Sequence, residues 1–408
     1  MRYRQYNPKC GEYPIPQSDR DQGINSDLHI YTQFKIEPAE TYLAYASWCQ
    51  FLDGIGPTHG QVNFNLGILG TKNMQDPVEF EDLMEIVIHE MTHILGFSDN
   101  DIPRWVDQQG RPYAKPSNTI IARGTPFLVV QTPHVLNYAR KYFNCPNLAG
   151  MPLENNGGQG SAGSHWETTV IQNEYMNAAQ SPTQAYYSAF TTNLLRDTGF
   201  FYEVSSSMEE QTFYGLGQGC NHVFGTCDST RKEYCRPRID DGQCDYYNHG
   251  SSTCEAGKYM DRGCNTLSTY SNSKCWDIKS NLNTQNNALL LGTKFGISSR
   301  CFPSTILKLG YQPETIPKGY CYQFQCTPNG QQVVVLVGGQ KVLCQKNLQQ
   351  LSVKGYSGYI VCPDNIHKFC GYKRFCPNFC SANGFCINNK CICIKGFYGP
   401  DCYSNIPV

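Results

Sequence analysis

Several features that mark common classes of protein are missing from this 408-residue chain. Lysine and arginine (33) balance aspartate and glutamate (34), so the net charge of −1 gives no electrostatic drive toward nucleic acid or an anionic membrane. No apolar run approaches the roughly 18 residues that a membrane span needs. The sequence also contains no Asn-X-Ser/Thr sequon, so no N-glycan is predicted.

Paired Cys-X-X-Cys elements are absent as well, although the chain has 22 cysteines. This absence argues against a set of zinc ribbons, and the even count favours disulfides formed in an oxidising compartment. We therefore expect an extracellular or cell-surface protein. Since the N-terminal residues lack the apolar core of a secretory signal, we expect the sequence to begin partway through the protein.

Hydrophobic periodicity predicts a chain of mixed helices and strands. Residues 28–36, 61–66 and 332–336 have the pattern of strands. The strongest helix signal begins at Asp76 as N-cap, with a glutamate three residues later, and stops at Gly96. Weaker patterns predict helices over 133–142 and 181–197, the second capped by Ser181, and a flexible glycine-rich loop over 155–164.

The strongest predicted helix carries a His-Glu-X-X-His motif at residues 89–93. Residues four apart lie on one helix face, so His89 and His93 can bind one Zn²⁺ while Glu90 takes a proton from metal-bound water. With nine histidines in the chain, composition alone would produce the motif in roughly one such sequence in a hundred. An accidental motif on a surface helix is the competing interpretation. The position in the last turns of a well-signalled helix favours the zinc site.

A catalytic zinc usually has three protein ligands and one open position for water, so a third ligand must lie elsewhere. Asp99, six residues after His93, would complete a compact H-E-X-X-H-X-X-G-X-X-D pattern. Glu154 is the first glutamate after the motif, and His165 follows a glycine-rich stretch. The spacing alone leaves these candidates open.

Longer stretches of the sequence resemble leishmanolysin, the metzincin protease of protozoan cell surfaces. The matching stretches are residues 10–16, 43–61, 144–148, 153–167, 172–176 and 197–202, together with the cysteines from 321 to 370. The resemblance therefore covers most of residues 8–375. In that family a long insertion separates the helix glycine from the third histidine, as the interval from Gly96 to His165 does here.

The resemblance implies an α+β fold of metzincin type, with a mixed sheet, an active-site helix and a Met-turn. It implies that His89, His93 and His165 bind one catalytic Zn²⁺, that Glu90 is the catalytic acid/base and that Met176 is the Met-turn residue below the metal. The implied units are an N-terminal catalytic subdomain (1–97), an inserted subdomain (98–200), a cysteine-rich domain (201–375) and a C-terminal module (376–402).

The last six cysteines have the spacing of an EGF-like module. A Cys-X-Cys is followed, after eight residues, by the final cysteine, with glycines in the gap. The usual pairing of such modules implies Cys376–Cys386, Cys380–Cys391 and Cys393–Cys402. The leishmanolysin resemblance implies two further disulfides, Cys10–Cys49 and Cys145–Cys220. Signal peptide, pro-segment and the first part of the mature subdomain of that family have no counterpart, and the tail replaces its anchor region.

The sequence therefore predicts a zinc-dependent metalloendopeptidase that hydrolyses internal peptide bonds of proteins. We expect a monomer whose C-terminal modules contact cell-surface or matrix proteins, with a role in cell adhesion. By the resemblance, the strand at 61–66 would align an extended substrate, with Asn63 as a candidate contact, and no residue is identified as an oxyanion stabiliser besides the metal. The alternative is a non-catalytic adhesion or matrix-binding protein on the same scaffold.

Overall fold

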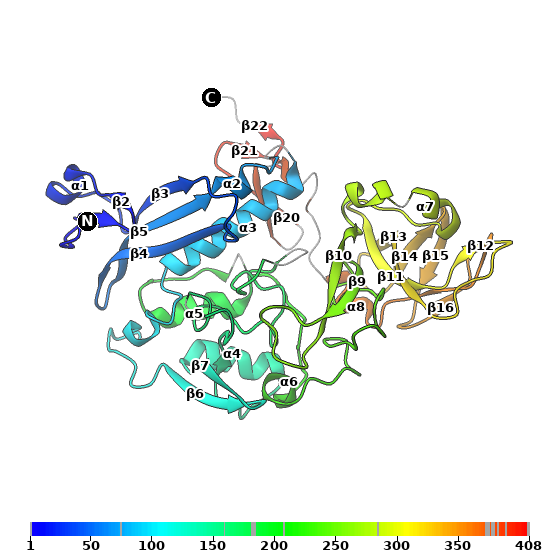
Figure 1. Ribbon diagram of the computed structural model, residues 1–408, viewed down its shortest axis with the longest axis horizontal. Helices are drawn as coiled ribbons and strands as arrows, with labels where there is room; N and C mark the ends of the chain where they lie inside the picture. The colour runs from blue at the N-terminus through cyan, green and yellow to red at the C-terminus, as the bar shows by residue number, and fades with distance from the viewer. Residues whose placement is uncertain are drawn as a thin grey trace.

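The computed structural model shows a mixed α/β protein with several small sheets (Figure 1). It describes residues 2–73, 76–158, 160–180, 185–206, 209–283, 285–371, 376, 380–381, 383–387 and 390–405. In Figure 1 the N-terminal sheet and helix α3 are blue, the central segment runs from cyan to green, and the sheet of the cysteine-rich segment is yellow and orange at the opposite side. No helix within these ranges is long and apolar enough to cross a membrane.

The N-terminal part contains a three-stranded sheet covered by one long helix. Its elements are β1 (Lys9–Cys10), β2 (Tyr13–Pro14), α1 (Gln17–Asp21), β3 (His29–Lys35), β4 (Ala44–Leu52), β5 (Gly56–Asn65), α2 (Leu66–Leu69) and α3 (Pro77–Ile94). The sheet order is β3-β5-β4, with β3 parallel and β4 antiparallel to β5. The strand predicted at 61–66 is thus the end of β5, which is paired on both sides.

Helix α3 has the ends that the sequence predicts. At its start the Glu79 N–H donates to Asp76 Oδ1 at 3.4 Å, which satisfies one of the donors that a helix N-terminus leaves open. At its end Gly96 takes φ +114°, a conformation that strains other residues, and the Phe97 N–H donates back to the Thr92 carbonyl. On the sheet below, Gly60 of β5 faces Ile94, which is fully buried.

The central segment packs a second small sheet and two helices around one hydrophobic core. Its elements are η1 (Ile102–Arg104), β6 (Ser117–Ala122), β7 (Thr125–Val130), α4 (Pro133–Phe143), β8 (Met151–Pro152) and α5 (Ala189–Thr198). The core contains fully buried aromatic side chains from distant positions, namely Phe97, Trp105, Phe143, Trp166 and Phe190. Residues 155–158 and 160–164 form turns and bends without regular structure, as their glycines predict.

The prediction of a helix from 181 to 197 is wrong at its start. Helix α5 begins at Ala189, and Ser188 is its N-cap, because the Ser188 side chain accepts a hydrogen bond from the Phe190 N–H. Residues 185–188 are not helical. The predicted cap Ser181 lies outside the described residues. The Ser-Pro pair at 181–182 has the sequence pattern of a helix start, and the local pattern did not identify Ser188 as the cap.

The cysteine-rich part is dominated by a six-stranded antiparallel sheet in the order β15-β14-β13-β11-β18-β16. The predicted strand at 332–336 is β14. The elements are α6 (Cys220–Phe224), β9 (Gly250–Glu255), β10 (Thr266–Lys274), η3 (Ile278–Asn283), α7 (Gln285–Leu291), β11 (Ser299–Ser304), β12 (Leu307–Lys308), β13 (Lys318–Cys326), β14 (Val333–Val337), β15 (Gln340–Cys344), β16 (Gln350–Leu351), β17 (Tyr356–Ser357), β18 (Ile360–Val361) and α8 (Ile366–Gly371). The tail adds β19 (Gly384–Ile387), β20 (Lys390–Cys393), β21 (Phe397–Tyr398) and β22 (Ser404–Asn405).

Disulfides join segments throughout the chain. Four pairs are those that the resemblances imply: Cys10–Cys49, Cys145–Cys220, Cys380–Cys391 and Cys393–Cys402. The other implied pair, Cys376–Cys386, falls outside what the structure describes, because the Cys386 side chain is not described. Six further pairs link Cys227–Cys264, Cys235–Cys254, Cys244–Cys301, Cys275–Cys321, Cys326–Cys370 and Cys344–Cys362.

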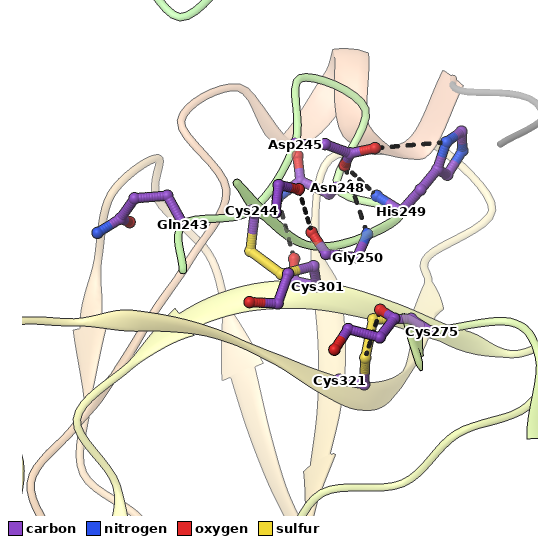
Figure 2. The surroundings of a disulfide bond; sticks show 12 residues. Gln243, Cys244, Asp245, Asn248, His249, Gly250, Cys275, Cys301 and Cys321 are labelled. Atoms are coloured by element: carbon purple, nitrogen blue, oxygen red, sulfur yellow. Dashed lines mark hydrogen bonds and ion pairs between the residues drawn. A yellow bond between two sulfur atoms is a disulfide. The ribbon is translucent and has the colours of Figure 1, made fainter. Parts of the chain in front are cut away.

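Figure 2 shows how two of these disulfides fix a loop on the six-stranded sheet. Cys244–Cys301 ties the loop to β11, and Cys275–Cys321 joins the end of β10 to β13. In the same loop the buried Asp245 carboxylate accepts hydrogen bonds from the backbone N–H groups of His249 and Gly250 (Figure 2). Burial raises the pKa of Asp245 to about 6, while these hydrogen bonds favour its ionised form.

The contact between Gly60 and Ile94 gives a test of how closely α3 packs on the sheet. A Cβ added at Gly60 would lie 2.6 Å from Ile94 Cγ2, in a core with no room to spare. We expect Gly60→Ala to lower the free energy of unfolding by about 1–3 kcal/mol. Chemical denaturation measures this, with the exposed loop substitution Glu40→Ala as a near-neutral control. Unchanged stability of Gly60→Ala would contradict the packing.

Candidate metal centre

Helix α3 brings the two histidines of the motif together, and the chain supplies a third from far away. The Nε2 atoms of His89 and His93 are 3.1 Å apart. His165, 72 residues beyond His93, places its own Nε2 atom 3.2 Å from each of them. The structure therefore brings together the three histidines that the leishmanolysin resemblance selects.

Each imidazole is oriented by a hydrogen bond on its other nitrogen. Nδ1 of His89 lies 2.5 Å from the Tyr175 carbonyl, and Nδ1 of His93 lies 2.7 Å from the Phe97 carbonyl. Nδ1 of His165 lies 2.9 Å from the Ser161 carbonyl. A carbonyl oxygen only accepts, so each Nδ1 carries the proton and each Nε2 directs a lone pair toward the centre of the group.

Each of these three carbonyls lies in or next to a turn of the chain. Gly96 ends α3 and turns the chain so that the Phe97 carbonyl returns to His93. Tyr175 precedes Met176 in a tight turn closed by the Asn177 N–H donating to the Glu174 carbonyl at 3.0 Å. Met176 itself is fully buried in the central core.

Glu174 is a positioning residue that our reading of the sequence missed. Its side chain is only 2% exposed, and its carboxylate accepts from the Met176 N–H and from the hydroxyls of Ser188 and Thr191. These bonds hold the turn whose Tyr175 carbonyl orients His89. Burial raises the pKa of Glu174 to about 7, against the hydrogen bonds, which lower it. A glutamate in the 172–176 stretch gives no local signal for this role.

The geometry of the triad fits a tetrahedral metal. Zn–N bonds of about 2.0–2.1 Å at tetrahedral angles put neighbouring nitrogens about 3.3 Å apart, close to the separations found here. Burial lowers the pKa of all three imidazoles, in His165 to about 3, so they stay in the neutral form that binds metal. Three inward lone pairs without protons repel one another unless a cation lies between them. The donor set, three neutral imidazoles, suits zinc.

Glu90 follows His89 in the helix and is 7% exposed. Burial raises the pKa of this carboxyl to about 8, whereas a divalent cation bound nearby would lower this pKa. Within the described parts of the chain its carboxylate has no hydrogen-bond partner. The group is therefore available to a water molecule or a substrate.

The two carboxylate candidates for the third ligand lie outside the triad. Asp99 is exposed, its N–H donates to Ser164 Oγ at 3.3 Å, and its carboxylate accepts from the same hydroxyl at 3.4 Å. It thus supports the segment that carries His165. Glu154 is buried, with its carboxylate bonded to the Asn156 N–H and the Thr168 hydroxyl.

Comparison with known proteins identifies the family of this chain. The sequence profile of the leishmanolysin family matches residues 4–371. The chain belongs to the leishmanolysin family. A profile of the EGF-like domain matches residues 376–402, so the family domain is followed by an EGF-like domain.

Among relatives of this leishmanolysin-family chain is the ciliated left-right organizer metallopeptidase of Danio rerio, 27% identical over 90% of this chain and 59% of its own length. Leishmanolysin of Leishmania major is 30% identical over 53% of this chain and 34% of its own. A leishmanolysin-like peptidase of Caenorhabditis elegans is 31% identical over 47% and 33%. The chain thus spans less than two thirds of the length of each of these relatives.

The third ligand can be tested by metal content. We expect His165→Ala to lose its equivalent of bound zinc after dialysis against a weak chelator, because two imidazoles do not complete the site. Asp99→Ala should retain one equivalent, since its carboxylate only supports Ser164. Elemental analysis of folded protein, checked by circular dichroism, measures both. Zinc lost from Asp99→Ala but kept by His165→Ala would reverse the assignment.

Proposed function

We propose that this chain is a zinc-dependent metalloendopeptidase that hydrolyses internal peptide bonds of proteins outside the cell or at its surface. The observation that carries the proposal is the triangle of Nε2 atoms, 3.1–3.2 Å on a side, formed on and beside a helix that also carries Glu90. Family membership supports a metal-dependent peptidase, and the identity of the metal as zinc rests on the donor set. We infer a monomer divided near residues 97, 200 and 375.

In the proposed mechanism the chain holds the metal and moves one proton. Bound Zn²⁺ would supply a Lewis acid that polarises the scissile carbonyl and acidifies a water molecule. His89, His93 and His165 would bind it through Nε2, with their Nδ1–H groups fixed by backbone carbonyls. The Glu90 carboxylate would take the proton from water and deliver it to the leaving nitrogen.

From the sheet order we infer that β4, and not β5, is the substrate strand. Asn63 is 1% exposed and lies in the middle strand β5, between Gln33 and Tyr45, so it cannot contact a peptide as we expected from the sequence. Strand β4 pairs only with β5 among the described strands, so its other edge has no strand partner there. An extended peptide pairing with β4 would form hydrogen bonds with the backbone N–H and C=O groups along that edge.

Strand β4 is also braced against the chain that follows the metal-binding helix. The Trp48 Nε1–H donates to Asp101 Oδ1 at 2.6 Å, and the Arg104 guanidinium lies 4.9 Å from the Trp48 ring and 4.8 Å from that of Phe51. These contacts couple the proposed substrate strand to the end of α3. A peptide on β4 would therefore meet a pre-organised metal site.

Met176 would serve as the apolar floor below the metal, consistent with its complete burial.

The EGF-like domain and the cysteine-rich segment would contact cell-surface or matrix proteins, with a role in adhesion. Retention of Glu90 and all three histidines favours catalysis over a purely non-catalytic adhesion scaffold.

The role of Glu90 can be separated from metal binding. Because its carboxylate would carry the proton, we expect Glu90→Gln to lower kcat on casein or a quenched peptide by about 10²–10⁴-fold while one zinc stays bound. Glu81→Gln on the same helix is the matched control and should keep activity. The chelator 1,10-phenanthroline should abolish turnover of the unaltered chain. Full activity of Glu90→Gln, or turnover that resists metal removal, would contradict the proposal.

A further inference from the structure

The N-terminal segment forms a hollow of about 470 Å³ on the protein surface. It is lined by three arginines, Arg2, Arg4 and Arg20, together with Tyr3, Gln5, Gln17 and Asp21. Arg20, Gln17 and Asp21 belong to α1, which lies beyond one end of the N-terminal sheet, near the N-terminus in Figure 1. None of these residues takes part in the metal centre.

Buried contacts hold the first arginines in place. Tyr3, only 3% exposed, is anchored by its N–H to the Asp19 carbonyl at 3.1 Å and by its hydroxyl to the Lys9 carbonyl at 2.9 Å. Gln50 of β4, 1% exposed, donates its Nε2–H to the Arg2 carbonyl at 2.9 Å and accepts the Arg4 N–H. With Tyr3 pinned inward, the flanking Arg2 and Arg4 are both exposed.

The arginines of this hollow have no acidic partner among the described residues, unlike five arginines elsewhere in the molecule. Carboxylates pair with the arginines at 111, 123, 196, 231 and 236. In the described residues no carboxylate comes within ion-pair distance of Arg2, Arg4 or Arg20. The acidic residue in the lining, Asp21, has both carboxylate oxygens hydrogen-bonded by Gln17 Nε2, at 3.0 and 3.1 Å.

We propose that this hollow, the arginine pocket, binds sulfate esters of a sulfated polysaccharide. The planar guanidinium matches two oxygens of a tetrahedral oxyanion, and several arginines around one hollow suit a ligand with repeated charges. Gln5 and Gln17 add amides that can bond sugar hydroxyls. Insertion into a lipid surface uses a group of exposed apolar side chains. Among the described residues before Phe34, Tyr6 is the one large hydrophobic side chain that is exposed.

Binding of the full chain to immobilised heparin tests this proposal, with fully desulfated heparin as the reference ligand. We expect sulfate-dependent binding that weakens with salt and falls about tenfold or more in the double variant Arg4→Ala/Arg20→Ala. Arg4→Lys/Arg20→Lys keeps the charge but loses the fork and should bind with intermediate affinity. Arg262→Ala, an exposed arginine outside the pocket, should bind like the unaltered chain. Peptide hydrolysis should be unchanged in all three.

Three results would overturn the proposal. Equal heparin affinity of Arg4→Ala/Arg20→Ala and the unaltered chain would remove the pocket from the binding site. Binding that survives desulfation would remove the sulfate. Binding to vesicles rich in phosphatidylserine without binding to heparin would assign the pocket to a membrane surface instead.

Discussion

The proposed site depends on one arrangement: three neutral imidazoles whose Nε2 atoms lie 3.1–3.2 Å apart, close to the spacing that a tetrahedral cation needs. The fold must orient all three rings to keep this spacing. It does so with the Phe97, Tyr175 and Ser161 carbonyls, each fixed by its own turn. The end of α3, the turn held by Glu174 and the glycine-rich loop therefore act together to orient the three imidazoles. A bound metal would be held by the Nε2 atoms that they direct inward.

The N-terminal end of the same helix is tied to a different part of the chain. Lys279 of η3 contacts Asp76 at 2.7 Å and Glu79 at 3.2 Å, so the cysteine-rich segment contacts the first turn of α3. Such exposed ion pairs contribute little stability individually. Their place matters more: the helix that carries His89 and His93 packs against the central core at its C-terminal end and contacts η3 of the cysteine-rich segment at its N-terminal end.

Local features of the sequence were sufficient where the cause is local. The cap at Asp76, the stop at Gly96 and the pairing of His89 with His93 follow from helix geometry and were predicted correctly. The proposed third ligand was not determined by spacing, because His165 is 72 residues from His93 and Asp99 stood at a shorter interval. Only longer-range resemblance favoured His165.

Nonlocal packing explains what the sequence did not predict. The edge position of β4 depends on strand order, and strand alternation alone does not reveal which neighbour lies on either side. The positioning role of Glu174 depends on hydroxyls of Ser188 and Thr191, which approach it only in the folded chain. The arginine pocket is likewise assembled by the contact of Gln50 with residues 2 and 4.

X-ray absorption at the zinc edge of the purified full chain tests the central claim most directly. The account predicts one zinc per chain, with three imidazole nitrogens at about 2.0–2.1 Å and one further light atom. A sulfur shell, a site with only two imidazoles, or folded protein that binds no stoichiometric zinc would contradict it.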